Sequence, residues 1–173
     1  TLNTSCEANV HNSSYIATVM RLSAADFSLT PSKEHNLVFS FEKNKDVTAF
    51  QADITLPEGM EFVSMDGDYV VFDDSRLSSR HTYYTNFVGE RTLRIVLSAS
   101  ANKPIQLDEG EFFTVRVKAG EGLGALSAIT VSGIEFARAT GSQIFQNDFS
   151  ISVSNPDVAA KAEADEKIDE VKS

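Results

Sequence analysis

The residue types that most often carry chemistry, histidine and cysteine, are few in this sequence and lie far apart. His11, His35 and His81 lack a histidine partner at the spacing of helical metal ligands, and Cys6 lacks a Cys-x-x-Cys partner. The chain also has no Gly-x-Ser-x-Gly turn, which would present a nucleophilic serine. These absences favour a protein without catalytic activity.

Two short segments have the composition of ligand-binding loops. Asp66, Asp68, Asp73 and Asp74 could supply carboxylates to calcium, but their spacing does not match the helix–loop–helix calcium loop, and acids are common in turns. Gly120–Gly124 is glycine-rich, but it joins two segments of strand character, whereas a phosphate loop leads into a helix. The sequence therefore favours solvated turns and predicts no metal or cofactor.

One polar strand face could bind another protein. Gln51, Asp53 and Thr55 alternate with apolar residues, so all three would project from the same side of a strand. Such a face is a candidate for a flat protein-binding patch. The alternative is a sheet face that is merely solvated.

Two adjacent tyrosines offer a second kind of binding site. Tyr83 and Tyr84 lie in Ser75–Phe87, a polar segment that we expect to be a loop. Aromatic rings stack on the apolar faces of sugars, so these residues are the candidates for glycan binding. The chain has no tryptophan, which weakens this alternative without excluding it.

The elements that would position these residues are predicted to be strands. Apolar and polar residues alternate from Tyr15 to about Val153, with interruptions at Gly, Pro, Asn and Asp. Short strands without helical periodicity between them indicate an all-β fold, a two-sheet jelly-roll or immunoglobulin-like sandwich of about nine strands. The strands are predicted at Asn36–Phe41, Val47–Leu56, Glu61–Ser64, Tyr69–Phe72, Thr92–Ser98, Phe112–Lys118, Ile129–Ala137 and Phe149–Val153.

Composition divides the chain into a central domain and two flanking segments. Residues 1–14 are expected to be a flexible polar leader, and residues 15–154 the sandwich. Residues 155–173 are rich in Ala, Glu, Lys and Asp, which favours a helix with Asp157 as its cap. We interpret this tail as a helical linker or as the start of a following module.

The totals limit the classes of partner. The 173 residues suffice for one domain with its own core. A net charge of −10 argues against nucleic acid as a partner, because phosphate binding needs clustered Lys and Arg. No stretch approaches the roughly 20 apolar residues of a membrane-spanning helix. The chain begins with Thr1, which suggests that an upstream segment, such as an export signal, has been removed.

Several segments together resemble a known family. Val47–Phe62, with the sequence Val-Thr-Ala-Phe-Gln-Ala-Asp-Ile-Thr-Leu-Pro-Glu-Gly-Met-Glu-Phe, is similar to the third-strand region of cohesin-like domains. Leu93–Ser100, Glu109–Phe113 and Ile129–Ala137 resemble the later strands of that family in the same order, so the similarity spans most of Tyr15–Val153. The chain is most similar to cohesin-like modules in large multidomain surface proteins of anaerobic gut bacteria.

The resemblance implies a fold and a class of function. Cohesin-like domains are nine-stranded jelly-roll sandwiches related to carbohydrate-binding modules, and their best-known members bind calcium-loaded dockerin domains through one sheet face. The chain is therefore expected to be a secreted or cell-surface module for adhesion or assembly, with a protein partner that could be dockerin-like. A carbohydrate-binding module and a structural spacer domain remain as alternatives, because a fold does not determine a ligand.

Overall fold

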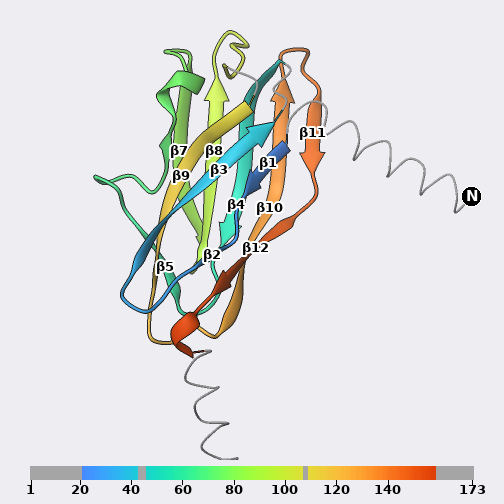
Figure 1. Ribbon diagram of the computed structural model, residues 1–173. Helices are drawn as coiled ribbons and strands as arrows, with labels where there is room; N and C mark the ends of the chain where they lie inside the picture. Colours follow the sequence, from blue (N-terminus) through green and yellow to red (C-terminus); the bar gives the residue numbers. More distant parts are fainter. Residues whose placement is uncertain (1–20, 43–45, 107–108, 159–173) are drawn as a thin grey trace, which may run out of the picture.

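Two β-sheets pack face to face around one apolar core in the computed structural model, which describes residues 21–42, 46–106 and 109–158 (Figure 1). In the five-stranded sheet the order is β1-β3-β9-β5, and β6 also pairs with β9. These strands are β1 (Arg21–Ala24), β3 (Glu34–Glu42), β5 (Met60–Val63), β6 (Val71–Phe72) and β9 (Glu109–Ala119).

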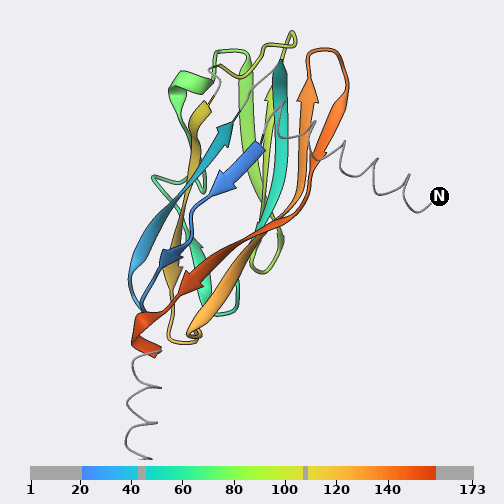
Figure 2. The same ribbon diagram turned by 45° about the vertical axis from the view of Figure 1, so that its right-hand side comes forward.

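The second sheet has seven strands in the order β2-β12-β10-β4-β8-β7, and β11 also pairs with β10. Its pairs are antiparallel except for β2 with β12. Figure 2 shows the two sheets as separate layers. These strands are β2 (Phe27–Ser28), β4 (Val47–Thr55), β7 (His81–Gly89), β8 (Thr92–Ala99), β10 (Leu126–Arg138), β11 (Gln143–Gln146) and β12 (Phe149–Ser154).

The core lies between the sheets and is rich in phenylalanine. Phe50 of β4 is buried, and its ring centroid lies 5.5 to 5.8 Å from those of Phe112, Phe113 and Phe136. These rings come from both sheets, so their contacts join the layers. Strand β4 follows the expected period, because Phe50, Ala52 and Ile54 are buried and the residues between them are half-buried.

After the central strand β4, the chain turns at Gly59. Gly59 has φ of 91°, and a Cβ on it would lie 2.5 Å from the backbone nitrogen of Leu123. Only glycine fits this close approach of two backbones. The Gly59 carbonyl accepts a hydrogen bond from the Gly120 N–H at 2.8 Å. The segment Gly120–Gly124 is thus the loop between β9 and β10, as the sequence predicts.

The all-β, two-sheet sandwich is confirmed, but the strand count is wrong: the described residues contain twelve strands instead of about nine. All predicted segments are strands, and β1, β2, β7 and β11 are additional. Strands β1, β2 and β11 have four residues or fewer, too few to show a periodic pattern.

The expected loop Ser75–Phe87 is also a wrong prediction, because β7 begins at His81. Strand β7 lies at the margin of its sheet, where side chains on both faces reach solvent, so its sequence shows no alternation. His35, expected at a turn, lies in β3. Both histidines are therefore strand residues.

The predictions for the two ends of the chain lie mostly outside the described residues. The leader 1–14, including Cys6 and His11, is among these, and so are residues 159–173 of the predicted helix. Within the described part, residues 156–158 are helical, and buried Asn155 before them donates from Nδ2 to the Leu123 carbonyl at 3.0 Å. No helix in the described ranges is long and apolar enough to cross a membrane.

Candidate functional site

The three predicted protein-binding residues lie together on β4, a central strand of the seven-stranded sheet. Gln51, Asp53 and Thr55 are half-buried and alternate with buried residues that face the core. They therefore project from the side of the sheet that faces away from the sandwich. We call this side the outer face of the seven-stranded sheet.

Asp53 and Thr55 have partners within this face. The Asp53 carboxylate accepts two hydrogen bonds from Arg94 of β8, from Nε at 2.8 Å and from Nη2 at 3.0 Å. Hydrogen bonding to Asp53 raises the pKa of Arg94, which favours the cationic form of the guanidinium. The Thr55 hydroxyl lies 2.9 Å from that of Thr92. Both contacts link side chains of neighbouring strands, and the Asp53–Arg94 pair neutralises the charge at the centre of this face.

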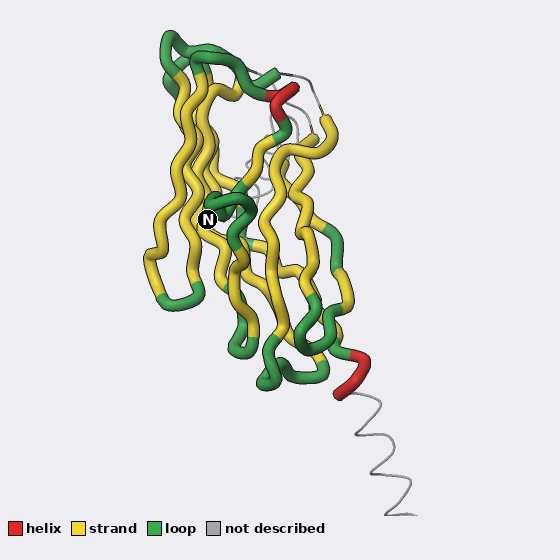
Figure 3. Tube along the Cα trace, turned by 90° about the vertical axis from the view of Figure 1, so that its left-hand side faces the viewer, coloured by secondary structure: helices red, strands yellow, loops and turns green. Residues whose placement is uncertain are grey.

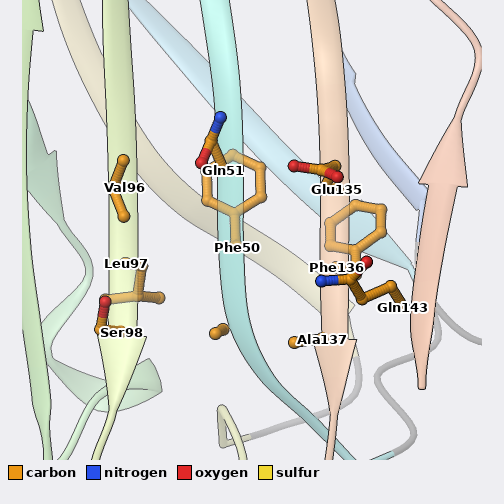
Figure 4. Close-up of a pocket in the computed structure, with 10 residues that line it drawn as sticks. Phe50, Gln51, Val96, Leu97, Ser98, Glu135, Phe136, Ala137 and Gln143 are labelled. Carbon is orange, nitrogen blue, oxygen red and sulfur yellow. The ribbon is translucent and has the colours of Figure 1, made fainter. Parts of the chain in front are cut away.

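Gln51 borders a shallow hollow (Figure 4). The hollow has a volume of about 160 Å³ and spans strands β8, β4, β10 and β11. Ala49 and Ala137, which pair across β4 and β10, also line it. Because these two side chains are only methyl groups, they leave a depression in the outer face of the sheet at this position. Glu135 and Gln143 add polar groups beside Gln51.

Two exposed aromatic side chains flank the hollow. Strand register places Tyr84 of β7 beside Val96, and Phe145 of β11 beside Glu135. Tyr84 is 59% exposed and Phe145 is 56% exposed. The register continues from strand to strand, so one row crosses the outer face, in the order Tyr84, Val96, Gln51, Glu135 and Phe145. We call these residues the transverse row.

The two tyrosines proposed for glycan binding lie on opposite sides of β7. Tyr84 is on the outer face, whereas Tyr83 points between the sheets, with its ring centroid 4.9 Å from that of Phe72. Successive strand residues project in opposite directions, so the pair does not form one stacking platform. Only Tyr84 shares a surface with Gln51.

Asp68 and Asp73, two of the acidic residues considered for calcium, have contacts that are typical of turns. Asp73 caps the short helix Asp74–Arg76, and its carboxylate accepts hydrogen bonds from the Ser75 hydroxyl at 2.7 Å and the Ser75 N–H at 3.0 Å. These hydrogen bonds lower the pKa of Asp73. Asp66 follows Met65, which forms an isolated bridge to Asp68. Across the described ranges, no group of three or more His, Cys, Asp or Glu is placed to hold a metal.

His81 has a supporting role at the start of β7. Its Nδ1 accepts a hydrogen bond from the Ser78 N–H at 3.1 Å, so the proton is on Nε2, which lies 3.0 Å from the Lys103 carbonyl. Burial lowers the pKa of His81 from its usual 6.5. The neutral ring thereby ties β7 to two loops.

The structure adds three residues to the candidate site: Val96, Glu135 and Phe145. Phe145 lies on β11, a strand too short to predict. Glu135 lies in a predicted strand, but the pairing of β10 with β4 shifts between Ser132 and Glu135, where Gly133 has a φ of 57°. The shift changes the parity of the outward-facing residues, so simple alternation along β10 would misplace Glu135. The local signal for this bulge is the glycine.

Comparisons with known proteins identify the fold through structure alone. No family model and no curated protein matches the sequence. The solved structures that match include a non-cellulosomal cohesin from the archaeon Archaeoglobus fulgidus. It is 14% identical with a TM-score of 0.60, over 83% of this chain and 97% of that one.

Two further solved structures, both from bacteria, are also similar. The domain CaCohA2 from Clostridium acetobutylicum is 15% identical with a TM-score of 0.65, over 79% of this chain and 90% of that one. The sixth cohesin of scaffoldin B from Acetivibrio cellulolyticus, solved in complex with a Cel5 dockerin, is 12% identical with a TM-score of 0.64. That match covers 80% of this chain and 99% of the other. At these identities the likeness establishes the fold.

Proposed function

We propose that this chain, which has the cohesin fold, is a non-catalytic interaction module that binds a protein partner on the outer face of its seven-stranded sheet. The observation that carries the proposal is the transverse row. Exposed aromatic rings stand at both ends of this row, and a hollow lies between them. Aromatic residues are enriched at the centres of protein interfaces, where charged residues are depleted.

The charges on this face also support a protein partner. The Asp53–Arg94 pair is internally neutralised, which leaves Glu135 as the carboxylate beside the hollow. A complementary surface would place an apolar side chain in the hollow and a basic group near Glu135. The hollow is smaller than the roughly 300 Å³ of typical small-molecule pockets, which argues for a protein surface over a small ligand.

The partner is proposed to be dockerin-like. Similar structures include cohesins solved in complex with dockerins. In this proposal calcium enters with the partner, and the module belongs to a secreted or cell-surface multidomain protein of the kind found in anaerobic gut bacteria. The helical residues 156–158 would then begin the connection to a neighbouring segment.

An affinity capture tests this function. The immobilised domain is exposed to secreted and surface extract with calcium or with a chelator, and retained proteins are identified by mass spectrometry. We expect calcium-dependent retention of a protein with a dockerin-like domain, and its loss from an equally folded Gln51→Arg variant. Retention no greater than on an unrelated sandwich would contradict the proposal and favour a spacer, whereas retention of glycans would favour the carbohydrate-binding alternative.

A further inference from the structure

The margins of the two sheets differ in how well they are protected. An edge strand has unpaired backbone N–H and C=O groups, and proteins usually shorten, charge or cover such edges. Strand β2 has only two residues, and β5 has four residues that include Glu61. Strand β1 is covered, because the Gln146 side chain accepts from the Leu22 N–H at 2.8 Å and donates to the Leu22 carbonyl at 2.8 Å.

Strand β7 has none of these protections. It has nine residues, and among the described strands it pairs only with β8 (Figure 1). The side of the molecule that carries it faces the viewer in Figure 3. Its sequence, His-Thr-Tyr-Tyr-Thr-Asn-Phe-Val-Gly, contains no Asp, Glu, Lys or Arg. The ring of His81 is buried, and burial lowers its pKa, which favours the neutral form.

The geometry and composition of β7 favour the addition of another strand. Its pairing with β8 is regular from His81 to Phe87, and the shift comes only after Phe87. Tyr84, Phe87 and Val88 are all more than 40% exposed. A long, regular, uncharged strand with exposed aromatic and β-branched residues is a template for β-sheet extension.

We propose that β7 pairs with β7 of a second copy of this chain, antiparallel across a two-fold axis. Charge restricts where a second copy can approach. Each chain carries a net charge of −10, so two copies repel over most of their surfaces. Strand β7 is a nine-residue edge along which no acid of one copy opposes an acid of the other. An antiparallel pair of identical strands is also self-complementary, as a two-fold interface requires.

The pairing would join the two seven-stranded sheets into one continuous sheet. Tyr84 of each copy would then lie near the seam, and both outer faces would lie on the same side. Two faces held together bind a partner with repeated modules through avidity. The self-pairing itself does not depend on the proposed function, because it is measured without a partner.

Sedimentation velocity over a range of protein concentrations tests the proposal, with the full 173-residue chain as the only component. We expect a concentration-dependent dimer that strengthens as salt screens the repulsion between the two acidic chains. A double variant, Thr82→Lys with Asn86→Lys, places four ammonium groups along the seam. It is expected to raise the dimer dissociation constant at least about ten-fold, because like charges across paired strands repel.

A second double variant, Ser150→Lys with Ser152→Lys, is the matched control. It makes the same change in net charge at exposed positions of β12, toward the opposite margin of the same sheet. We expect this control to dimerise at least as well as the unmodified chain, since both variants reduce the overall repulsion. Circular dichroism establishes that each variant is folded. A chain that stays monomeric up to millimolar concentration, or a dimer that folded β7 variants retain, would overturn the proposal.

Discussion

The outer faces of the two sheets are built on the same core but differ in charge. Across the five-stranded sheet, the strand register places Lys118 between Glu34 and Glu61. In the neighbouring row of paired residues, Arg116 Nε donates a hydrogen bond to Asn36 Oδ1 at 2.8 Å. Such a face keeps long charged side chains in solvent. The transverse row of the seven-stranded sheet has a single charged residue, Glu135, together with two exposed aromatic rings.

This difference supports the placement of the proposed binding site on the seven-stranded sheet. The inward residues of β3 and β4 alternate in the same way and fill one core. Their requirement is volume and apolarity, which both sheets meet. The outward residues are free of that requirement, so the depletion of charge and the exposed aromatic residues on one face need another explanation. The proposed protein interface would supply it.

The largest effect is expected from Phe50→Ala, which removes support from both faces at once. Phe50 is 2% exposed and contacts phenylalanines of both sheets. Deletion of a buried phenylalanine ring costs about 3 to 5 kcal/mol of unfolding free energy. Urea denaturation measures this loss. A cost below about 1 kcal/mol would show that the two faces do not share one core.

The second-largest effect is expected on the affinity for the partner, which should distinguish the outer faces of the two sheets. Gln51→Arg puts a bulky cation at the rim of the hollow, and partner affinity is expected to fall about 100-fold, as for substitutions at interface centres. The matched variant is Ser40→Arg, at a half-buried outward position of β3 on the five-stranded sheet. It is expected to leave affinity within about two-fold. Isothermal titration with the captured partner measures both, and equal losses would remove the distinction between the faces.

The aromatic ends of the transverse row are expected to contribute less. Tyr84→Ala and Phe145→Ala should each lower partner affinity about ten-fold, because each removes exposed apolar area that the partner would cover. Their unfolding free energies should change by less than about 1 kcal/mol, since neither ring is in the core. Binding kinetics for the two variants give this comparison. Unchanged affinity in both would limit the interface to the centre of the face.

The smallest effect is a dependence of stability on pH. The folded-state pKa of His81 is lowered by burial, so the unfolded chain binds its proton more readily. Its contribution is therefore fully present above about pH 6.5 and is lost as pH falls through the folded-state pKa. His35 has the same direction of shift. Thermal unfolding at pH 7 and pH 5 should show a decrease in Tm that is smaller in His81→Gln, and an identical decrease in that variant would contradict the role of His81.

The sequence predicted the inner half of this molecule better than the outer half. Burial imposes a period of two, which made the buried face of β4 and the outward position of Gln51 predictable. Phe145 was not predictable, because β11 has only four residues and its position depends on contacts distant in sequence. To predict that Tyr83 and Tyr84 project in opposite directions, β7 would have to be recognised as a strand. Its side chains are mostly exposed on both faces, so its sequence lacks the alternation that indicates a strand.

The most direct test of the central claim is hydroxyl-radical footprinting of the chain, free and bound to its captured partner. This measurement reports the solvent access of individual side chains, so it compares the two outer faces within one sample. We predict that Tyr84, Val96 and Phe145 become protected on binding, while Val38 and Val63 on the five-stranded sheet keep their reactivity. Protection of Val38 and Val63 without protection of Tyr84 and Phe145 would contradict the account.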